Sequence, residues 1–590
     1  MYYTYFQLPL TCNLLRWSIY VSLLCLRFLF VFNLQSGYLH PDEYFQSIEI
    51  AAGDIYDLDV LRTWEFHLAD KGPLRSVAGM LPFVHIPIQV AKWIYDWLNS
   101  ETTKTDFSGS DMLDRVVFPS RLITVLGSCL IDIFILRFSI HYGRHHQLFV
   151  NPNKIRSILH VVRNFSVPTA LLLYASCAFG GSLWSTRTIV NVWESIYVSV
   201  FGLLFLQILD RLEQSPNLAT TKHFIIVVVC VQSAIVVWGS FLRPTYALFI
   251  FPLGCIELAF IFIKLKYVFI ILCLPAVLFV VFLNTLLCVI IDTLYFHNIN
   301  VLQVFKTDFS RFQLICTPCR FFTYNTNSHH VSSHGLHSRF THFFINWPLI
   351  LGPIFTVHLF FQSLRRRSLS LCLSWICVTV PTLILSTIPH QEARFLIPCL
   401  PFACFIIGWS IDTKLKRANG KEVSYIFIIS AILWMFHQFI LILFYGYLHQ
   451  AGLLSYMKTI PISVNECITH VFFRTYMPPR FPLDIPLNKS YDPPQSCKSL
   501  IDLGGSNFMV LNHTINRLKT YENFSGILKL VYPGSILLLQ NLPLSSWGDV
   551  IKAEQFFPHL SMENLPSIQY PFVYENWRSQ LSLHVLTIKV

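Results

Sequence analysis

The chain has 590 residues, of which 54% are hydrophobic and only 13% are charged, and its formal net charge at pH 7 is +11. A soluble domain carries roughly 25% charged residues, so this composition excludes a soluble globular protein and indicates one that crosses a membrane repeatedly. The positive charge does not indicate nucleic-acid binding, because the basic residues form short clusters between apolar segments, as in membrane-protein loops.

Apolar segments of about 18 to 25 residues recur along the sequence, each enough for one helix across a hydrocarbon core of roughly 30 Å. The first segment is longer than the apolar core of a secretory signal, and we interpret it as an uncleaved anchor. The predicted fold class is an all-α polytopic membrane protein with about eleven transmembrane helices. Their predicted bounds are 14–34, 117–142, 167–184, 190–208, 223–241, 245–263, 268–291, 343–361, 369–388, 396–411 and 424–446.

The apolar stretch 78–98 is interrupted by prolines and polar residues, so we interpret it as interfacial or re-entrant and do not count it as a span. With a cytosolic N-terminus, the basic clusters then fall in cytosolic loops, as the positive-inside rule requires. Counting 78–98 as a span would place those clusters outside. The loops 35–116 and 292–342 lie opposite the cytosol in this topology.

The C-terminal region 447–590 also falls opposite the cytosol, after a membrane domain that comprises residues 1–446. Its glycosylation sequons at Asn488, Asn512 and Asn523 indicate the same side. The sequon at Asn164 falls in a cytosolic loop, so we expect it to be unused. Cysteines Cys467 and Cys497 are candidates for a disulfide if this region is lumenal.

Charged and aromatic residues occur together in six segments, all on the predicted non-cytosolic face. The cytosolic loops are short and basic, so we expect chemistry on the other face. The six segments are His40-Pro-Asp42-Glu43, Thr63-Trp-Glu65 with Arg75, Thr186 through Glu194, Arg243-Pro-Thr245, Tyr324 through His337, and His390 through Arg394.

Asp42 and Glu43 follow the first span, where exposed charge has no packing purpose. Pro41 restrains the backbone before them, and aromatic residues flank them, so the carboxylates are presented in a partly apolar setting. Such a carboxylate is suited to take a proton from a hydroxyl group. A structural ion pair is the alternative interpretation.

Other polar residues have structural alternatives as well. Arg187, Asn191 and Glu194 have the spacing of one helix face, which fits either a structural polar seam or a cavity wall. Arg27 and Asp132 lie within spans, and we favour structural pairing for each.

Metal and redox chemistry are not favoured by the sequence. The histidines around His334 and His337 lack a matching set of cysteines or carboxylates, so no metal site is predicted. The pair Cys316-Thr-Pro-Cys319 has redox-motif spacing, but no thioredoxin-like βαβ pattern surrounds it.

Seven ordered strings resemble the dolichol-phosphate-mannose-dependent mannosyltransferases of glycosyltransferase family 22, and in particular its branch that acts on the glycosylphosphatidylinositol (GPI) precursor. The resemblance extends from residue 37 to 452. It departs from the family pattern at Ser338, Ala393 and Ile189, where we expect proline, proline and phenylalanine. The strings are HPDEYFQS, TWEF, STRTIVNVWES, FLRPT, YNTNSHHVSSHGLHSRFTHFFINWPLILGP, PHQEARFLIP and GYLHQAG.

The resemblance implies a GT-C fold in the endoplasmic reticulum membrane, with its catalytic cavity on the lumenal side. The implied donor is dolichyl phosphate mannose, a lipid-linked substrate, and the implied acceptor is the third mannose of the GPI glycolipid. The expected product is an α-1,2-mannoside formed with inversion, without a cofactor or a metal. Sister enzymes that act on the third GPI mannose or on the N-glycan precursor are the alternatives.

The resemblance also implies roles for individual residues. Asp42 is the expected general base, and Glu43 is expected to orient the acceptor or tune Asp42. The expected donor phosphate ligands are Arg243, Arg394, His337 and His390. The expected substrate-binding residues are His40, Arg187, Asn191, Glu194, His334 and Glu392. A transporter is disfavoured, because its polar residues would lie near the midplane, often in repeated halves.

Overall fold

The protein is described here from a computed structural model of the chain. The residues that the structure describes are 10–33, 35–68, 72–98, 109–145, 167–214, 218–299, 313–327, 335–362, 369–418, 425–460, 468–483, 499–520, 526–536, 546–567 and 574–590. Cys467, Cys497, His334 and the sequons at Asn164, Asn488 and Asn523 lie outside them.

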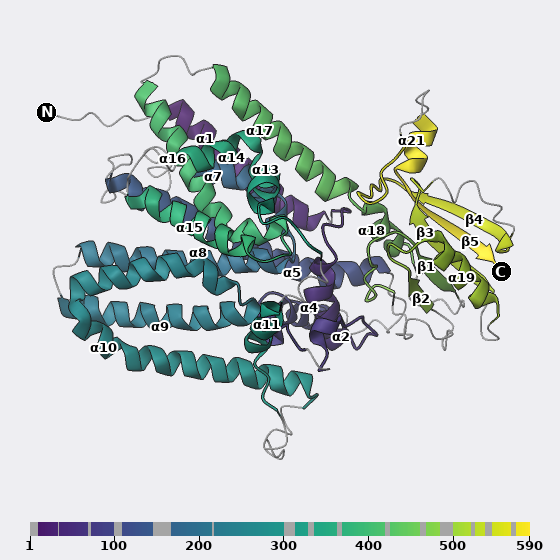
Figure 1. The fold of residues 1–590 in the computed structure, drawn as a ribbon, viewed down its shortest axis with the longest axis horizontal. Helices are drawn as coiled ribbons and strands as arrows, with labels where there is room; N and C mark the ends of the chain where they lie inside the picture. The colour runs from purple at the N-terminus through teal and green to yellow at the C-terminus, as the bar shows by residue number, and fades with distance from the viewer. Residues whose placement is uncertain are drawn as a thin grey trace. The chain divides into compact units, whose positions relative to one another are not determined.

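Helices make up most of the described chain, and five strands lie near its C-terminus (Figure 1). The helices are α1 (Leu10–Phe32), α2 (Glu49–Tyr56), α3 (Val77–Met80), α4 (His85–Leu98), α5 (Gly109–His145), α7 (Thr169–Ser176), α8 (Val190–Gln214), α9 (Leu218–Leu242), α10 (Tyr246–Phe296), α11 (Thr317–Thr326), α13 (Trp347–Leu351), α14 (Pro353–Gln362), α15 (Leu369–Ser386), α16 (Leu400–Ala418), α17 (Tyr425–Leu443), α18 (Ala451–Lys458), α19 (Phe508–Lys519) and α21 (Tyr574–Gln580). The strands are β1 (Thr469–Phe472), β2 (Ser499–Asp502), β3 (Ile527–Pro533), β4 (Asp549–Phe556) and β5 (Leu583–Lys589).

The chain forms two compact units, and each is discontinuous in sequence. The first unit contains Met1–Phe30, Trp64–Phe83 and Leu122–Phe439. The second contains Val31–Thr63, Val84–Arg121 and Ile440–Val590. The HPDE segment therefore belongs to the same unit as the C-terminal region, whereas the other polar segments that carry the predicted site belong mainly to the first unit.

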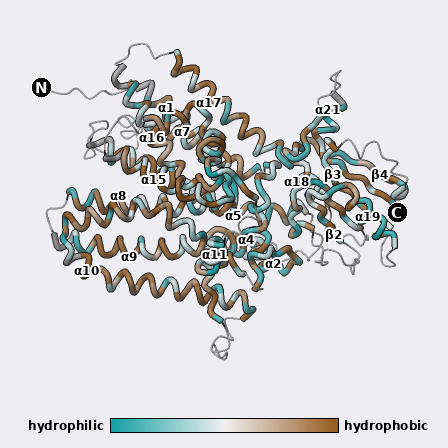
Figure 2. Tube along the Cα trace, in the orientation of Figure 1, coloured by the Kyte–Doolittle hydropathy of each residue, from teal (hydrophilic) through white to brown (hydrophobic). Residues whose placement is uncertain are grey.

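Among the described residues, eight helices are long and apolar enough to cross a membrane, or nine if one bent pair is a single span. These long helices are hydrophobic along most of their length (Figure 2). The bent pair, residues 342–351 and 353–361, turns by 118° at Gly352, whose φ of +76° favours glycine. The predicted span 369–388 corresponds to the shorter helix α15.

The predicted helix at 167–184 is wrong beyond Ser176. Helix α7 has only eight residues, and Cys177 then adopts an extended conformation. A Cβ atom at Gly181 would collide with the guanidinium of Arg27, so the glycine lets this buried arginine pack against the backbone. Arg27 forms a buried ion pair with Asp132, Nη1 to Oδ2 2.9 Å, which confirms the structural pairing favoured for these two residues.

Helix α4 is too short to cross a membrane, in agreement with the prediction that 78–98 is not a span. Its residues Ile86, Val90, Trp93 and Trp97 recur at helical spacing on one face and are exposed, with Trp93 67% and Trp97 70% accessible. An exposed apolar stripe with two tryptophans is typical of a helix that lies in the membrane interface.

Asp292, in α10, connects three segments of the first unit. Its Oδ1 accepts hydrogen bonds from the backbone nitrogens of Val77 and Ala78, each at 3.0 Å, and from the hydroxyl of Ser76 at 3.1 Å. Its Oδ2 accepts the hydroxyl of Thr317 at 2.9 Å. This buried carboxylate thereby fixes the start of α3 and the start of α11 on the end of α10.

Replacing Asp292 by alanine is expected to destabilise the fold by about 2–6 kcal/mol, because two buried backbone N–H groups lose their acceptor at roughly 1–3 kcal/mol each. Asp292→Asn keeps one oxygen and should cost less. Thermal unfolding of the purified protein tests this order, with the exposed Asp549→Ala as the matched control. Equal midpoints for wild type and Asp292→Ala would show that the carboxylate does not hold these segments.

The region 447–590 contains a five-stranded sheet, so the all-α class is wrong for this part of the chain. The strand order is β2-β1-β3-β5-β4; β1 is parallel to β2 and β3, and β5 is antiparallel to β3 and β4. Helix α19 packs Leu511, Ile515 and Leu518 into the same core as Leu530 and Leu586 of the sheet. Strands β1, β3 and β5 are mostly buried, whereas β4 is polar and largely exposed at the edge of the sheet.

Candidate active site

The HPDE segment lies directly before a π-helix, Tyr44–Ile48, that continues into α2. Glu43 is fully buried, and its Oε1 accepts a hydrogen bond from Nη2 of Arg121 in α5 at 2.8 Å. The Asp42 side chain is 24% accessible and lies beside His40, with Oδ1 3.6 Å from Nδ1. The two adjacent carboxylates therefore have different environments, one buried in an ion pair and one open to a substrate.

Glu49, one turn further along, anchors this segment. Its carboxylate accepts hydrogen bonds from the backbone nitrogens of Leu61 at 3.2 Å, Arg480 at 3.0 Å and Phe481 at 3.4 Å. Burial raises the pKa of Glu49 to about 7, although these hydrogen bonds oppose the shift. Sequence reasoning missed this residue; the available signal was a carboxylate within an otherwise apolar helical stretch. The backbone that follows Asp42 is thus held by two buried carboxylates, Glu43 and Glu49.

In the first unit, two of the expected phosphate ligands lie around one aromatic ring. The guanidinium carbon of Arg243 is 4.9 Å from the centroid of the Phe395 ring, and that of Arg394 is 5.6 Å from it. Both arginines are buried. Burial, with the neighbouring charges of Arg75 and Arg394, lowers the pKa of Arg243 to about 10, so it remains a cation at neutral pH.

The HGLH and PHQE strings lie side by side in the fold, although His337 and Gln391 are 54 residues apart in the sequence. The backbone nitrogen of His337 donates to the carbonyl of Pro389 at 2.9 Å, and the backbone nitrogen of Gln391 donates to Nδ1 of His337 at 3.2 Å. The rings of His337 and His390 have centroids 5.4 Å apart. The structure thus brings the two expected histidine ligands together.

Glu392 connects the histidines to the arginines. Its Oε1 lies 2.7 Å from Nε2 of His390, and its Oε2 accepts a hydrogen bond from Nε of Arg394. The carboxylate holds both side chains in one orientation. Four of the predicted residues, His337, His390, Glu392 and Arg394, therefore form one connected group.

Glu194 lies in the first turns of α8 and is fully buried. It accepts hydrogen bonds from the hydroxyl of Thr245 at 2.6 Å and from Nδ2 of Asn191 at 3.4 Å, and its charge acts on Arg243. The expectation that Arg187 shares a helix face with Asn191 and Glu194 is wrong. Arg187 has an extended backbone, and α8 begins only at Val190.

One cluster of metal-ligating type occurs among the described residues, and it contains none of the predicted site residues. Its members His141, Asp210 and Glu213 have ligand atoms within 4.8 Å of one another. Asp210 already lies 2.9 Å from Nδ1 of His141 and 3.4 Å from Nη2 of Arg137. These contacts account for the cluster as a polar junction between α5 and α8.

Long apolar helices, a partly accessible carboxylate and a connected group of a buried arginine, a glutamate and two histidines are typical of a polytopic membrane enzyme of the group-transfer type. The profile of the Alg9-like mannosyltransferase family, glycosyltransferase family 22, matches residues 18–472, and the chain belongs to that family. It is therefore a mannosyltransferase.

Named relatives align over most of the chain. The GPI mannosyltransferase 4 of Drosophila melanogaster is 26% identical, with 94% of this chain and 87% of the relative aligned. That of Schizosaccharomyces pombe is 28% identical over 81% of this chain and 74% of the relative. Among solved structures, ArnT from Cupriavidus metallidurans bound to undecaprenyl phosphate superposes with a TM-score of 0.47 at 10% identity, over 97% of both chains.

Proposed function

We propose that this mannosyltransferase transfers mannose from dolichyl phosphate mannose to the third mannose of the GPI precursor and forms an α-1,2 linkage. The observation that carries the proposal is the family match over residues 18–472, combined with relatives named GPI mannosyltransferase 4 in a fly and in fungi. The full set of seven strings supports the same branch.

The proposed enzyme resides in the endoplasmic reticulum membrane, with a GT-C fold and its site on the lumenal side. In this topology the bent pair, α15 and the α7 segment also cross the membrane, which gives about eleven crossings and a lumenal C-terminus. The disulfide between Cys316 and Cys319 supports a lumenal loop at 292–342, because such bonds persist in an oxidising compartment.

In the proposed reaction Asp42 accepts the proton of the attacking acceptor hydroxyl, and the anomeric carbon inverts in one displacement. Glu43, which is held in a buried ion pair with Arg121, fixes the HPDE segment and tunes the neighbouring Asp42 carboxylate. Negative charge develops on the leaving lipid phosphate. Arg243 and Arg394, with His337 and His390, provide fixed positive charge and hydrogen-bond donors for that phosphate.

The experiment that tests the proposal is a microsomal assay with labelled dolichyl phosphate mannose and a trimannosyl GPI precursor. The expected product has four mannoses, and an α-1,2-specific mannosidase should release the new one. A product formed only from a dimannosyl GPI or from an N-glycan precursor would assign the chain to a sister enzyme. Microsomes without the protein provide the blank.

Replacing Arg394 by alanine should lower kcat/KM for dolichyl phosphate mannose by about 10- to 100-fold, because a charge-assisted hydrogen bond of roughly 1.5–3 kcal/mol is lost. The donor KM should account for much of this loss, and the acceptor KM should change little. Steady-state kinetics with each substrate varied separately measures both. Arg517→Ala, on the exposed surface of α19, is the matched control. Unchanged donor dependence would remove Arg394 from the phosphate site.

Chelation is expected to leave the reaction rate unchanged, because arginines and histidines supply the charge that a metal ion supplies in other glycosyltransferases. The measurement compares initial rates before and after dialysis against EDTA. Loss of activity that added Mg²⁺ or Mn²⁺ restores would contradict this part of the mechanism.

A further inference from the structure

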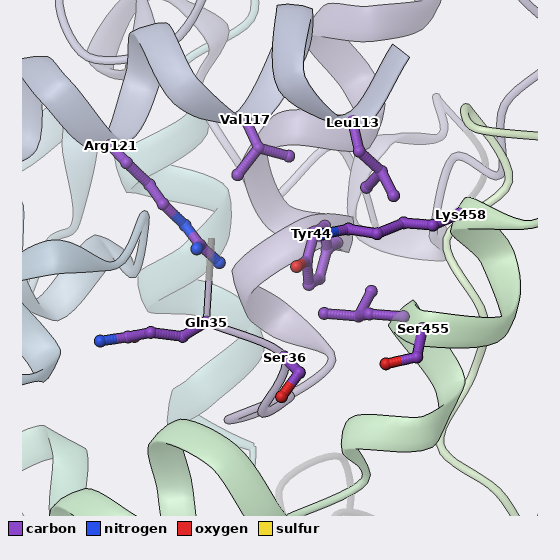
Figure 3. A pocket seen from close by; sticks show the side chains of 9 residues that line it. Gln35, Ser36, Tyr44, Leu113, Val117, Arg121, Ser455 and Lys458 are labelled. Carbon is purple, nitrogen blue, oxygen red and sulfur yellow. The ribbon is translucent and has the colours of Figure 1, made fainter. Parts of the chain in front are cut away.

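A small pocket lies in the second unit between α5 and α18, beside the HPDE segment. The space inside it, including the part open to solvent, is about 320 Å³. Arg121 and Lys458 enter it from different sides, one from α5 and one from α18 (Figure 3). The remaining lining residues are Gln35, Ser36, Tyr44, Leu113, Val117, Leu454 and Ser455.

Two polar side chains of this pocket, Arg121 and Gln35, have atoms without a hydrogen-bond partner in the described part of the chain. Among the described residues, neither Nε nor Nη1 of Arg121 has a hydrogen-bond partner, and the same holds for both amide atoms of Gln35. Arg121 is 1% and Gln35 2% accessible, so both are nine-tenths buried or more. Unmade hydrogen bonds of buried groups are costly, and a ligand with several acceptor oxygens would satisfy the arginine.

Two cationic side chains line the pocket. Glu43 pairs with Nη2 of Arg121, and the ammonium of Lys458 is a second cation, on which the carboxylate of Asp114 acts electrostatically. A guanidinium edge with a nearby ammonium suits the oxygens of a phosphate group. Leu113, Val117 and Leu454 form an apolar wall, which suits the hydrocarbon part of the same ligand.

The length of α5 indicates the depth of the pocket in the membrane. The apolar part of this helix, Ser110–Tyr142, has 33 residues, about 50 Å at 1.5 Å per residue, so it exceeds a hydrocarbon core of roughly 30 Å. Arg137 pairs with Asp210 at one end, and Arg121 lies 16 positions before it, about 24 Å along the axis. Arg121 therefore lies within one core thickness of Arg137, in the half of α5 that begins at Gly109.

We propose that the pocket lined by Arg121, Gln35 and Lys458 binds the phosphate headgroup of a membrane lipid. None of the residues that line this pocket belongs to the phosphate site proposed for the sugar donor. Bound lipid would place its phosphate next to the ion pair that supports the HPDE segment, so lipid occupancy would stabilise that segment.

Photo-crosslinking tests the proposal on the full-length protein in phosphatidylcholine bicelles. The probes are photoactivatable phosphatidic acid and photoactivatable phosphatidylcholine with identical acyl chains, and adducts are mapped to the peptides around residues 109–121 and 451–458. Phosphatidic acid should label these peptides preferentially. Lys458→Gln should reduce that labelling about tenfold, the effect of losing roughly 1.4 kcal/mol.

Two further variants separate site loss from nonspecific effects. Ser455→Phe fills the pocket without a change of charge and should reduce labelling as Lys458→Gln does. Lys552→Gln, which removes an exposed lysine on β4, should leave the labelling unchanged.

Equal labelling by both lipids, or phosphatidic acid labelling that neither pocket variant lowers, would overturn the proposal. If excess inorganic phosphate abolishes the labelling, the pocket binds a free anion, and the assignment to a lipid headgroup is wrong. Mannosyl transfer is not measured, so this outcome is independent of the proposed enzyme reaction.

Discussion

Asp42→Asn is expected to lower the rate of mannosyl transfer by at least about 100-fold, the lower range for loss of a general base. The amide has nearly the same shape as the carboxylate but cannot accept the proton of the acceptor hydroxyl. Asp42 is partly accessible, and the buried contacts of Glu43 and Glu49 hold its backbone in place. The amount of folded protein should therefore not change.

The measurement is the initial rate in microsomes that contain equal amounts of wild-type and variant protein. Asp59→Asn provides the matched control, because it makes the same chemical change at an exposed position of the same loop. The control should retain wild-type activity. An Asp42→Asn enzyme that transfers mannose at the wild-type rate would exclude Asp42 as the base.

Glu43→Gln is expected to destabilise the fold by about 3–5 kcal/mol, because it leaves the buried charge of Arg121 uncompensated. Both side chains are almost completely buried, with 1% of Arg121 and none of Glu43 accessible. Thermal unfolding of the purified protein and its monodispersity in detergent report the change. The double variant Glu43→Leu with Arg121→Met removes both charges and should recover much of the lost stability.

A surface ion pair provides the comparison for Glu43. Arg62 pairs with Asp54, and the Arg62 side chain is 37% accessible. Arg62→Gln should cost no more than about 1 kcal/mol, because solvent screens an exposed pair. If Glu43→Gln proves as stable as Arg62→Gln, Glu43 does not depend on its ion pair, and direct contact with the acceptor becomes its better explanation.

The long membrane helices could be predicted from the sequence because length and apolarity are local properties. The end of α7 at Ser176 could not, because the residues that follow stay apolar and continue the same pattern. The packing of Arg27 against Gly181 was also not predictable, because the two residues are far apart in sequence. The C-terminal sheet was missed for a related reason. Its strands are short and pair across long connections, so no single segment carries a strong signal.

The residues of the candidate site were largely predictable, but their partners were not. Charge and aromatic residues in apolar surroundings identified the segments around Asp42, Arg243 and His390. The partner of Glu43 was missed, although Arg121 lies inside a predicted span, where an ionisable residue is a functional candidate by default. Which of the many polar groups pairs with it depends on helix packing, which the sequence does not encode locally.

The side of the membrane on which the HPDE segment lies is the central claim, and mapping of N-glycans on the protein from microsomes tests it most directly. Peptide mass spectrometry after enzymatic deglycosylation distinguishes the four sequons. The proposed topology predicts glycans at one or more of Asn488, Asn512 and Asn523, and none at Asn164. A glycan at Asn164, with none in the C-terminal region, would place residue 42 in the cytosol and contradict the proposed lumenal mannosyl transfer.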